Sequence, residues 1–133
     1  SDKEEMGGIP EELEDCFYCM GHIDDATMKA VMEYADLGFS PTLWEGFDLP
    51  FGEMQYLHKH MYVFAVGAHP EVAAHPFFLC QSKEEAVRKI CQDLSGTLPV
   101  RAEELEQALD QFCAKFTWKR CADAILRKMQ KVG

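Results

Sequence analysis

Apolar residues gather along the chain in two patterns. Short uninterrupted apolar runs are typical of strands that are buried on both faces, and such runs occur at residues 16–20, 37–40, 61–66 and 77–80. Elsewhere apolar residues recur every three or four positions, which is the spacing of an amphipathic helix. This second pattern predicts helices at residues 24–35, 52–59, 82–95 and 102–116, and a further helix that follows Thr117.

Polar residues at the expected helix starts support this division. Asp24 and Thr117 are suited to accept a hydrogen bond from a first-turn amide, and Ser82 with Glu85 three residues later forms a capping-box pattern. Because strands and helices alternate, we expect an α/β fold with a Rossmann-like parallel sheet flanked by helices. Residues 1–15 are predicted to be a polar leader and residues 16–133 one domain.

Charge and hydropathy exclude several classes of function. The net charge of −10 argues against a surface for nucleic acid or for anionic membrane, because phosphates attract Lys and Arg. No apolar run approaches the roughly 20 residues of a membrane span, and no segment has the pattern of a signal peptide. We therefore expect a cytoplasmic protein with no nucleic-acid partner and no membrane span.

The six cysteines are predicted to be free thiols. Most lie in apolar segments, so we expect them to be buried in a protein from a reducing compartment. Cys16 and Cys19 have the spacing of half a zinc site, but no second pair with such spacing follows. The sequence therefore predicts no metal.

Candidate chemistry concentrates in the segment SPTLWEGFDLPFGEMQYL, residues 40–57. It follows a predicted strand and opens a helix, and ligands of open α/β sheets bind at the carboxyl ends of strands. Gly46 permits close approach of a ligand, and free amides at a helix start attract an anion such as a diphosphate. Glu45 and Glu53 would accept hydrogen bonds from sugar or ribose hydroxyls. The alternative is a sharp turn with one capping and one solvated glutamate.

The same segment resembles the nucleotide-sugar-binding part of retaining GT-B glycosyltransferases of the group 1 type. The resemblance runs through SPTLWEGFDLPFGEMQYLHKHMYVFAVGAHPEV, upstream through GHIDDATMKAVMEYADLGFSP and downstream through FTWKRCADAILRKM, and it covers about residues 16–130. It implies a partial C-terminal domain of a GT-B fold and transfer of a sugar from a nucleotide-diphosphate donor with retention of configuration.

The resemblance also implies roles for individual residues. Glu45 matches the glutamate beside the reacting carbon of the donor sugar, and Glu53 matches the glutamate that holds the ribose hydroxyls. The donor diphosphate and sugar would lie against the backbone of Gly46, Phe47, Asp48 and Leu49. The family needs no tightly bound metal and no other cofactor, so the donor is a substrate and its diphosphate charge is stabilised by amides and basic residues.

Two parts of the family enzyme have no counterpart in this sequence. They are the N-terminal acceptor domain and the Arg and Lys that neutralise the diphosphate, and no Lys or Arg occurs between Lys29 and Lys59. We therefore expect a C-terminal fragment of a longer transferase that is inactive alone. The alternatives are a non-catalytic, glycosyltransferase-like binding or scaffold module, and an unrelated α/β domain.

Four residues depart from the family pattern or leave their roles open. Asp48 replaces a glycine, and its carboxylate is expected either to point away from a diphosphate or to bind a sugar hydroxyl. His58 and His60 replace a glycine and a proline; a helix cap is favoured over a metal pair. His69 would contact the ligand or lie on the surface.

One edge of the sheet is expected to be open. The resemblance lacks the strand that would lie beside residues 37–40, and open apolar edges recruit other strands. We expect either residues 16–20 to move in beside 37–40 or two copies of the fragment to form a homodimer.

Overall fold

A three-stranded parallel sheet forms the centre of the larger of two units in this chain. The computed structural model describes residues 8–132, and the chain divides after Val31. In the unit that starts at Met32, β1 (Gly38–Ser40), β2 (Met61–Phe64) and β3 (Leu79–Cys80) lie in the order β1-β2-β3. Gly38 pairs with Met61 and Val63 with Leu79, both in parallel register. The predicted α/β class with a parallel sheet is confirmed.

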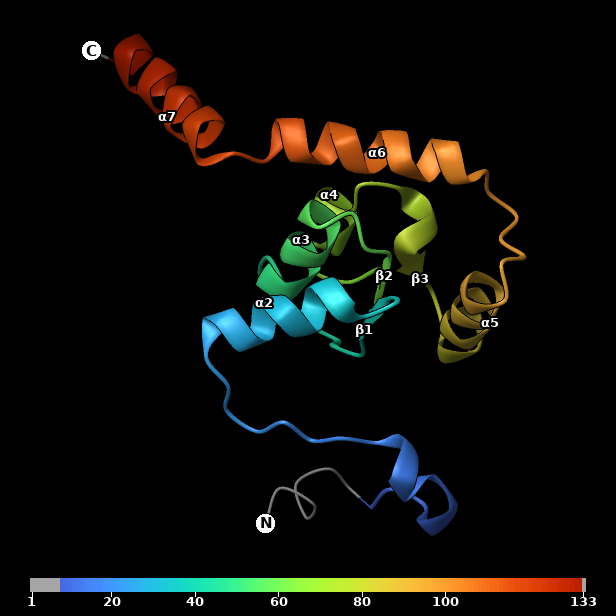
Figure 1. The fold of residues 1–133 in the computed structure, drawn as a ribbon. Helices are drawn as coiled ribbons and strands as arrows, with labels where there is room; N and C mark the ends of the chain where they lie inside the picture. Colours follow the sequence, from blue (N-terminus) through green and yellow to red (C-terminus); the bar gives the residue numbers. More distant parts are fainter. Residues whose placement is uncertain (1–7, 133) are drawn as a thin grey trace. The chain divides into compact units, whose positions relative to one another are not determined.

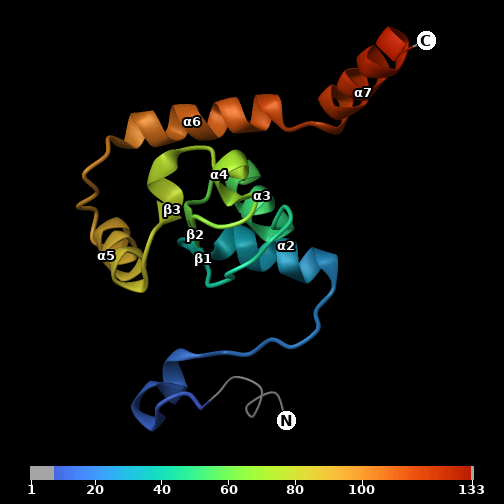
Figure 2. The same ribbon diagram turned by 180° about the vertical axis from the view of Figure 1, so that it is seen from behind.

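Helices connect and cover these strands. Figure 1 shows α3 (Leu49–Tyr56) and α5 (Lys83–Leu94) on opposite sides of the sheet, which explains why every residue of β2 is buried. The short helices α4 (His69–Val72) and η2 (Pro76–Phe78) connect β2 to β3. Both ribbon views show α6 (Ala102–Lys115) running past α3 and α4 (Figures 1 and 2).

The core joins the sheet to the helices on both sides. Its largest fully buried apolar or aromatic side chains are Tyr62, Phe51, Phe78, Leu105 and Leu109. The last two, with Phe112, form the predicted apolar face of α6, which is the face that contacts α3. The capping prediction at Ser82 is also confirmed, because its hydroxyl accepts a hydrogen bond from the Glu85 amide at 3.1 Å. This core fixes α3, and with it the loop that precedes α3.

The unit that ends at Val31 contains no strand among its described residues. It has a 3-10 helix η1 (Glu11–Cys16) and, after an irregular segment, the start of α2 (Asp25–Tyr34), which Asp24 caps by accepting from the Thr27 amide at 2.7 Å. The predicted strand at residues 16–20 is wrong. Its residues are exposed and pair with no other strand, and a lone strand leaves its backbone groups without ladder partners. Residues 16–20 therefore contribute no strand to the three-stranded sheet.

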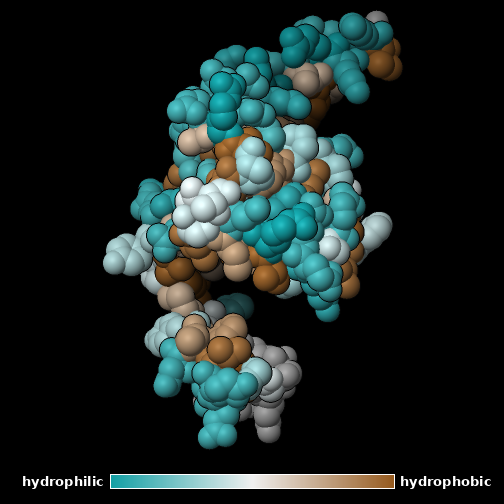
Figure 3. All heavy atoms as spheres, turned by 90° about the vertical axis from the view of Figure 1, so that its right-hand side faces the viewer, coloured by the Kyte–Doolittle hydropathy of each residue, from teal (hydrophilic) through white to brown (hydrophobic). Residues whose placement is uncertain are grey.

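The last helix, α7 (Trp118–Val132), forms as predicted but keeps its apolar side chains exposed. The Arg120 amide donates to Thr117 Oγ1 at 3.2 Å, which confirms the cap. Ile125 and Leu126 are each 54% exposed. Figure 3 views the molecule from the right-hand side of Figure 1. Hydrophilic residues cover much of the surface in this view, and the apolar residues lie in separate groups. Within residues 8–132, none of the helices combines the length and apolarity needed to cross a bilayer.

The cysteines are free thiols in the structure, but most are not buried. Cys80 is the buried one, and Cys113 is half-buried. Cys16 and Cys19 lie exposed in the unit that ends at Val31. Cys91 and Cys121 lie on solvent-facing positions of helices. The expectation of buried thiols is therefore wrong for four of the six. Cys91 lies on the exposed face of α5, whose other face packs on the core, and the other three lie in segments whose described residues are mostly exposed.

Candidate functional site

A pocket of about 640 Å³ lies at the carboxyl end of β1. Its walls are the end of β1, the loop that follows, the first turn of α3 and the first residue of β2. They comprise Phe39, Ser40, Pro41, Thr42, Glu45, Gly46, Phe47, Asp48, Leu49, Pro50 and Met61. The hydroxyl groups of Ser40 and Thr42 form a hydrogen bond of 3.0 Å. The pocket coincides with the segment that carries the resemblance.

The structure brings one of the two candidate glutamates to this pocket. Glu45 lies in the wall and is half-buried. Glu53 is exposed in the second turn of α3 and is not part of the wall. The predicted backbone segment Gly46, Phe47, Asp48 and Leu49 does line the pocket. The pocket therefore combines two carboxylates, those of Glu45 and Asp48, with two hydroxyls and the backbone of the loop.

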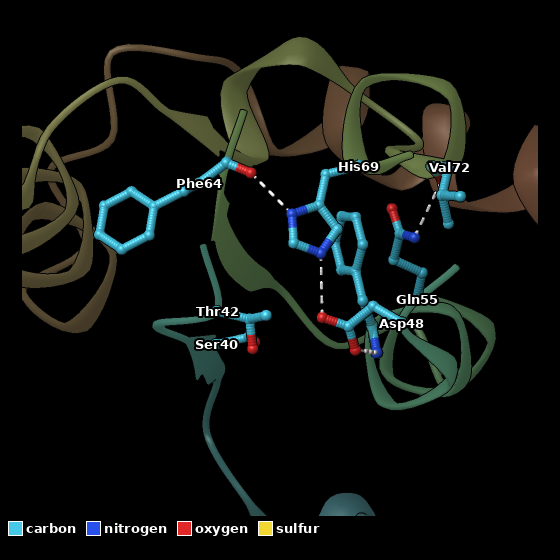
Figure 4. Close-up of polar contacts among 8 residues, drawn as sticks. Ser40, Thr42, Asp48, Gln55, Phe64, His69 and Val72 are labelled. Carbon is cyan, nitrogen blue, oxygen red and sulfur yellow. Dashed lines mark hydrogen bonds and ion pairs between the residues drawn. The ribbon is translucent and has the colours of Figure 1, made fainter. Parts of the chain in front are cut away.

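Asp48 is a structural residue at the start of α3. It has left-handed backbone angles, with φ 61°, and its Oδ1 accepts a hydrogen bond from the Phe51 amide at 3.1 Å. Its Oδ2 lies 3.0 Å from His69 Nε2 (Figure 4). Aspartate tolerates left-handed angles better than most residues because its short side chain bonds locally. Of the two alternatives predicted for Asp48, this geometry favours the one in which the carboxylate points away from a ligand.

His69 is completely buried and uses both ring nitrogens. Its Nδ1 lies 2.7 Å from the carbonyl oxygen of Phe64. A carbonyl only accepts, so Nδ1 carries hydrogen and donates. The contact between Nε2 and Asp48 then requires a second proton, on Nε2 or on the carboxyl group. Both expectations for His69, contact with a ligand and exposure on the surface, are wrong, and His69 instead joins the end of β2 to the start of α3.

Gln55 makes a second buried connection on the same side of the sheet. Its Nε2 donates to the Val72 carbonyl at 3.2 Å, and its Oε1 accepts from the Ala74 amide at 2.6 Å. The side chain is fully buried, and Figure 4 shows it beside the His69 contacts. Gln55 thereby fixes α4 against α3, so the helix behind the pocket has two polar attachments to the 64–74 segment.

Gly67 holds the pocket loop by close backbone approach. Its φ is +54°, and a Cβ placed on it would lie well inside 3.0 Å of the Glu45 carbonyl oxygen. The neighbouring Ala68 amide donates to that same oxygen at 3.3 Å. The backbone of Glu45 is therefore attached to the turn after β2, and only glycine at position 67 leaves room for it.

These contacts occupy amides expected to bind an anion at the start of α3. The Phe51 amide is bonded to the Asp48 carboxylate, and the Gly52 amide is bonded to the Asp48 carbonyl at 3.1 Å. Pro50 has no amide hydrogen. Among the described residues, the pocket wall contains no Lys or Arg. The helix start alone thus offers little to a diphosphate, contrary to the expectation of several free amides.

His58 and His60 bind side-chain carboxylates of later helices. The backbone of His58, with a φ of 58°, also ends α3: its amide donates to the Gln55 carbonyl at 3.0 Å, and the next amide donates to the Met54 carbonyl at 2.9 Å. His58 Nδ1 lies 2.6 Å from Glu106 Oε1 of α6, and His60 Nδ1 lies 2.7 Å from Asp93 Oδ2 of α5. Asp93 also accepts a hydrogen bond from Tyr62, whose pKa is raised chiefly by burial. The two side chains therefore diverge to different partners. The predicted cap of α3 is present at His58, through its backbone and not its side chain, and is wrong for His60.

Comparison with known proteins gives no relative for this chain. Neither a protein-family model, nor a curated protein, nor a solved structure matches it. The geometry of the pocket and the sequence resemblance are therefore the grounds for a functional proposal.

Proposed function

We propose that this chain is part of the donor-binding half of a retaining glycosyltransferase and that the pocket at the carboxyl end of β1 receives a nucleotide sugar. The observation that carries the proposal is the coincidence of that pocket with residues 45–49, the core of the resembling segment. Ligands of open α/β sheets bind at this edge.

In this proposal the residues of the wall act on the sugar end of the donor. The Glu45 carboxylate accepts hydrogen bonds from sugar hydroxyls beside the reacting carbon, and the backbone from Gly46 to Leu49 lies along the sugar and diphosphate. No atom within 4 Å would meet a Cβ at Gly46, so the chain is open to a ligand at this position. Glu53, exposed in the second turn of α3, holds the ribose.

The charge of the pocket limits what the chain can do alone. Its wall includes two carboxylates, Glu45 and Asp48, and among the described residues no Lys or Arg. Charge-assisted bonds contribute about 1.5–3 kcal/mol each, and the proposed enzyme would obtain them from basic residues outside this sequence, along with the acceptor domain. We expect the chain alone to bind nucleotide sugars with a Kd of about 1 mM, or roughly −4 kcal/mol, and to have no transferase activity.

The lack of Lys and Arg in the described wall also favours a second candidate, a non-catalytic module that uses the pocket for binding alone. The two candidates differ in the complete protein. In an active transferase, Glu45→Ala lowers the transfer rate more than it weakens donor binding, because the group acts on charge that develops in the transition state. Glu53→Ala weakens donor binding more than it lowers the transfer rate, because contacts with the ribose are similar in the ground state and in the transition state. A complete protein that binds donor but transfers no sugar is the non-catalytic module.

The pocket assignment can be tested on the chain itself by amide chemical-shift mapping. Uridine, guanosine and adenosine diphosphate sugars are titrated to millimolar concentration, and we expect one of them to shift the amides of residues 45–49. Glu45→Ala should reduce that response, whereas Glu71→Ala, which removes an exposed glutamate of α4 outside the wall, should leave it unchanged. Shifts confined to other parts of the chain, or none with any donor, would overturn the proposal.

A further inference from the structure

Three side chains with metal-binding chemistry, His58, Glu106 and Asp110, meet where the end of α3 contacts α6, and Cys113 lies beside His58. His58 follows α3 and projects to α6, on which Glu106, Asp110 and Cys113 are four and three residues apart and so share one face. His58 Nδ1 lies 2.6 Å from Glu106, and His58 Nε2 lies 3.6 Å from Asp110 Oδ1 and 3.7 Å from Cys113 Sγ. This cluster lies at the opposite end of α3 from the pocket.

The distances around Nε2 agree with tetrahedral zinc. Zinc bonds to nitrogen and oxygen at about 2.0–2.2 Å and to sulfur at about 2.3 Å. Two ligands at the tetrahedral angle are then separated by about 3.4 Å for nitrogen and oxygen, and by about 3.6 Å for nitrogen and sulfur. The observed separations from Nε2 slightly exceed these values. Asp110 is exposed, so its carboxylate can turn toward the Cys113 sulfur to admit the ion.

Glu106 has the position of an outer carboxylate that orients a ligand histidine. An ionised carboxylate only accepts, so its contact with Nδ1 places a hydrogen on that nitrogen, and Nε2 is the ring nitrogen that faces Asp110 and Cys113. Metal-bound histidines commonly donate their other N–H to a carboxylate in this way. Nε2, the Asp110 carboxylate and the Cys113 sulfur are all electron-rich, and a cation between them would satisfy all three.

The surroundings favour a divalent cation further. A surface hollow on α6 is lined by Ala102, Gln107 and the carboxylates of Glu103, Glu106 and Asp110. The Cys113 thiol lies half-buried on the same helix as these carboxylates. In the metal-free protein this thiol donates to the Tyr56 carbonyl at 3.6 Å. Binding of a metal would release that proton, as thiolate ligation requires.

We propose that His58, Asp110 and Cys113 bind Zn²⁺ as three ligands, with Glu106 orienting His58 and water in the fourth position. The ion would tie α6 to the end of α3 and so complete the cover of the core. The site departs from the metal-free chain expected from the sequence, because a search for paired spacings does not join His58 to residues of a distant helix. It does not depend on the proposed glycosyltransferase function.

Two features of the same chain provide matched controls. His75 Nε2 lies 3.0 Å from Glu104 Oε1, also on α6, without a further ligand from the described residues. Cys16 and Cys19 have the zinc-like spacing but lie exposed in the other unit. His75→Asn therefore removes a comparable ion pair, and Cys16→Ser with Cys19→Ser removes the competing thiols.

The test is calorimetric titration of the reduced, chelator-treated chain with Zn²⁺, together with absorption spectra of the Co²⁺ form. We expect one Zn²⁺ per chain and a near-ultraviolet band from thiolate bonded to Co²⁺. His58→Asn, Asp110→Asn and Cys113→Ser should each weaken binding at least tenfold, and Cys113→Ser should abolish the band. Glu106→Gln should weaken binding by about 10–100-fold.

The variants are chosen to preserve the fold. His58 has a φ of 58°, and asparagine tolerates this left-handed conformation. The Asp110 side chain is 66% exposed, so Asp110→Asn leaves the fold intact. The control variants should bind like the unaltered chain. The proposal is overturned if no stoichiometric Zn²⁺ binds, if binding survives His58→Asn and Cys113→Ser, or if it is lost in the Cys16, Cys19 variant instead.

Discussion

Replacement of Gly67 by alanine should damage the candidate pocket from a position outside its wall. Gly67 has left-handed backbone angles, and alanine in that conformation costs about 1–2 kcal/mol. The added Cβ would also lie well inside 3.0 Å of the Glu45 carbonyl oxygen, a separation that real Cβ atoms essentially never show, so one backbone must move. Overpacking of this kind costs typically about 1–3 kcal/mol. We expect a total loss of about 2–5 kcal/mol from the two effects.

Two other glycines separate these contributions. Gly96 has a φ of +70° and no atom within 4 Å of an added Cβ. Gly96→Ala therefore reports the backbone cost alone, about 1–2 kcal/mol. Gly46 has neither a left-handed φ nor a close neighbour. Gly46→Ala should accordingly change the free energy of unfolding by less than about 0.5 kcal/mol.

The free energies of unfolding are to be measured by urea denaturation followed by circular dichroism. We expect a lower midpoint with an unchanged m value for Gly67→Ala. If Gly67→Ala costs no more than Gly96→Ala, the close approach to Glu45 does not restrain the loop and the reasoning fails.

Four further substitutions probe the polar contacts around the sheet. His69→Leu leaves the buried Asp48 carboxylate without its partner and should destabilise the fold by about 3–5 kcal/mol; Asp48→Asn, which can keep the helix cap, should cost less in the same urea assay. Lys89 donates to two backbone carbonyls, so Lys89→Met should cost about 1.5–3 kcal/mol for each, and a loss under about 1 kcal/mol would contradict that role. Hydrogen bonds from the Gln81 amide and from Lys89 lower the pKa of Glu85. The Glu85 carboxylate therefore stabilises the fold at pH values above the ordinary glutamate pKa, and this stabilisation is lost as the pH falls through the lowered pKa of the folded chain. Glu85→Gln should therefore be less stable than the unaltered chain at neutral pH, with the difference shrinking in acid.

Local patterns were sufficient to predict most of the larger unit. The run at 61–66 became β2, although it ends at Phe64, and the cap at Ser82 starts α5 as expected. The helix predicted from residue 52 begins at Leu49, because Asp48 caps it. Aspartate is a preferred N-cap residue, so this start is compatible with the sequence. The left-handed backbone of Asp48 and its contact with His69 follow only from the structure.

The errors share a physical origin. The apolar run at 16–20 has strand composition, but composition does not supply a neighbouring strand to accept its hydrogen bonds. Within the candidate site, Glu45 and residues 46–49 could be predicted because they are contiguous. The attachments that hold this loop, Gly67 and His69, are separated from it in sequence, and their roles follow only from the packing of the turn after β2.

The strand order also determines how the chain can acquire its fold. Each strand pairs with the next one along the chain, Gly38 with Met61 and then Val63 with Leu79, so each pairing closes only a short loop. The sheet can therefore assemble in synthesis order, before α6 exists. Until α6 arrives, the core surface that it covers remains exposed, and an intermediate with exposed apolar surface is prone to aggregate. The nascent chain is consequently most dependent on chaperones during the interval in which β3 and α5 have emerged and α6 has not.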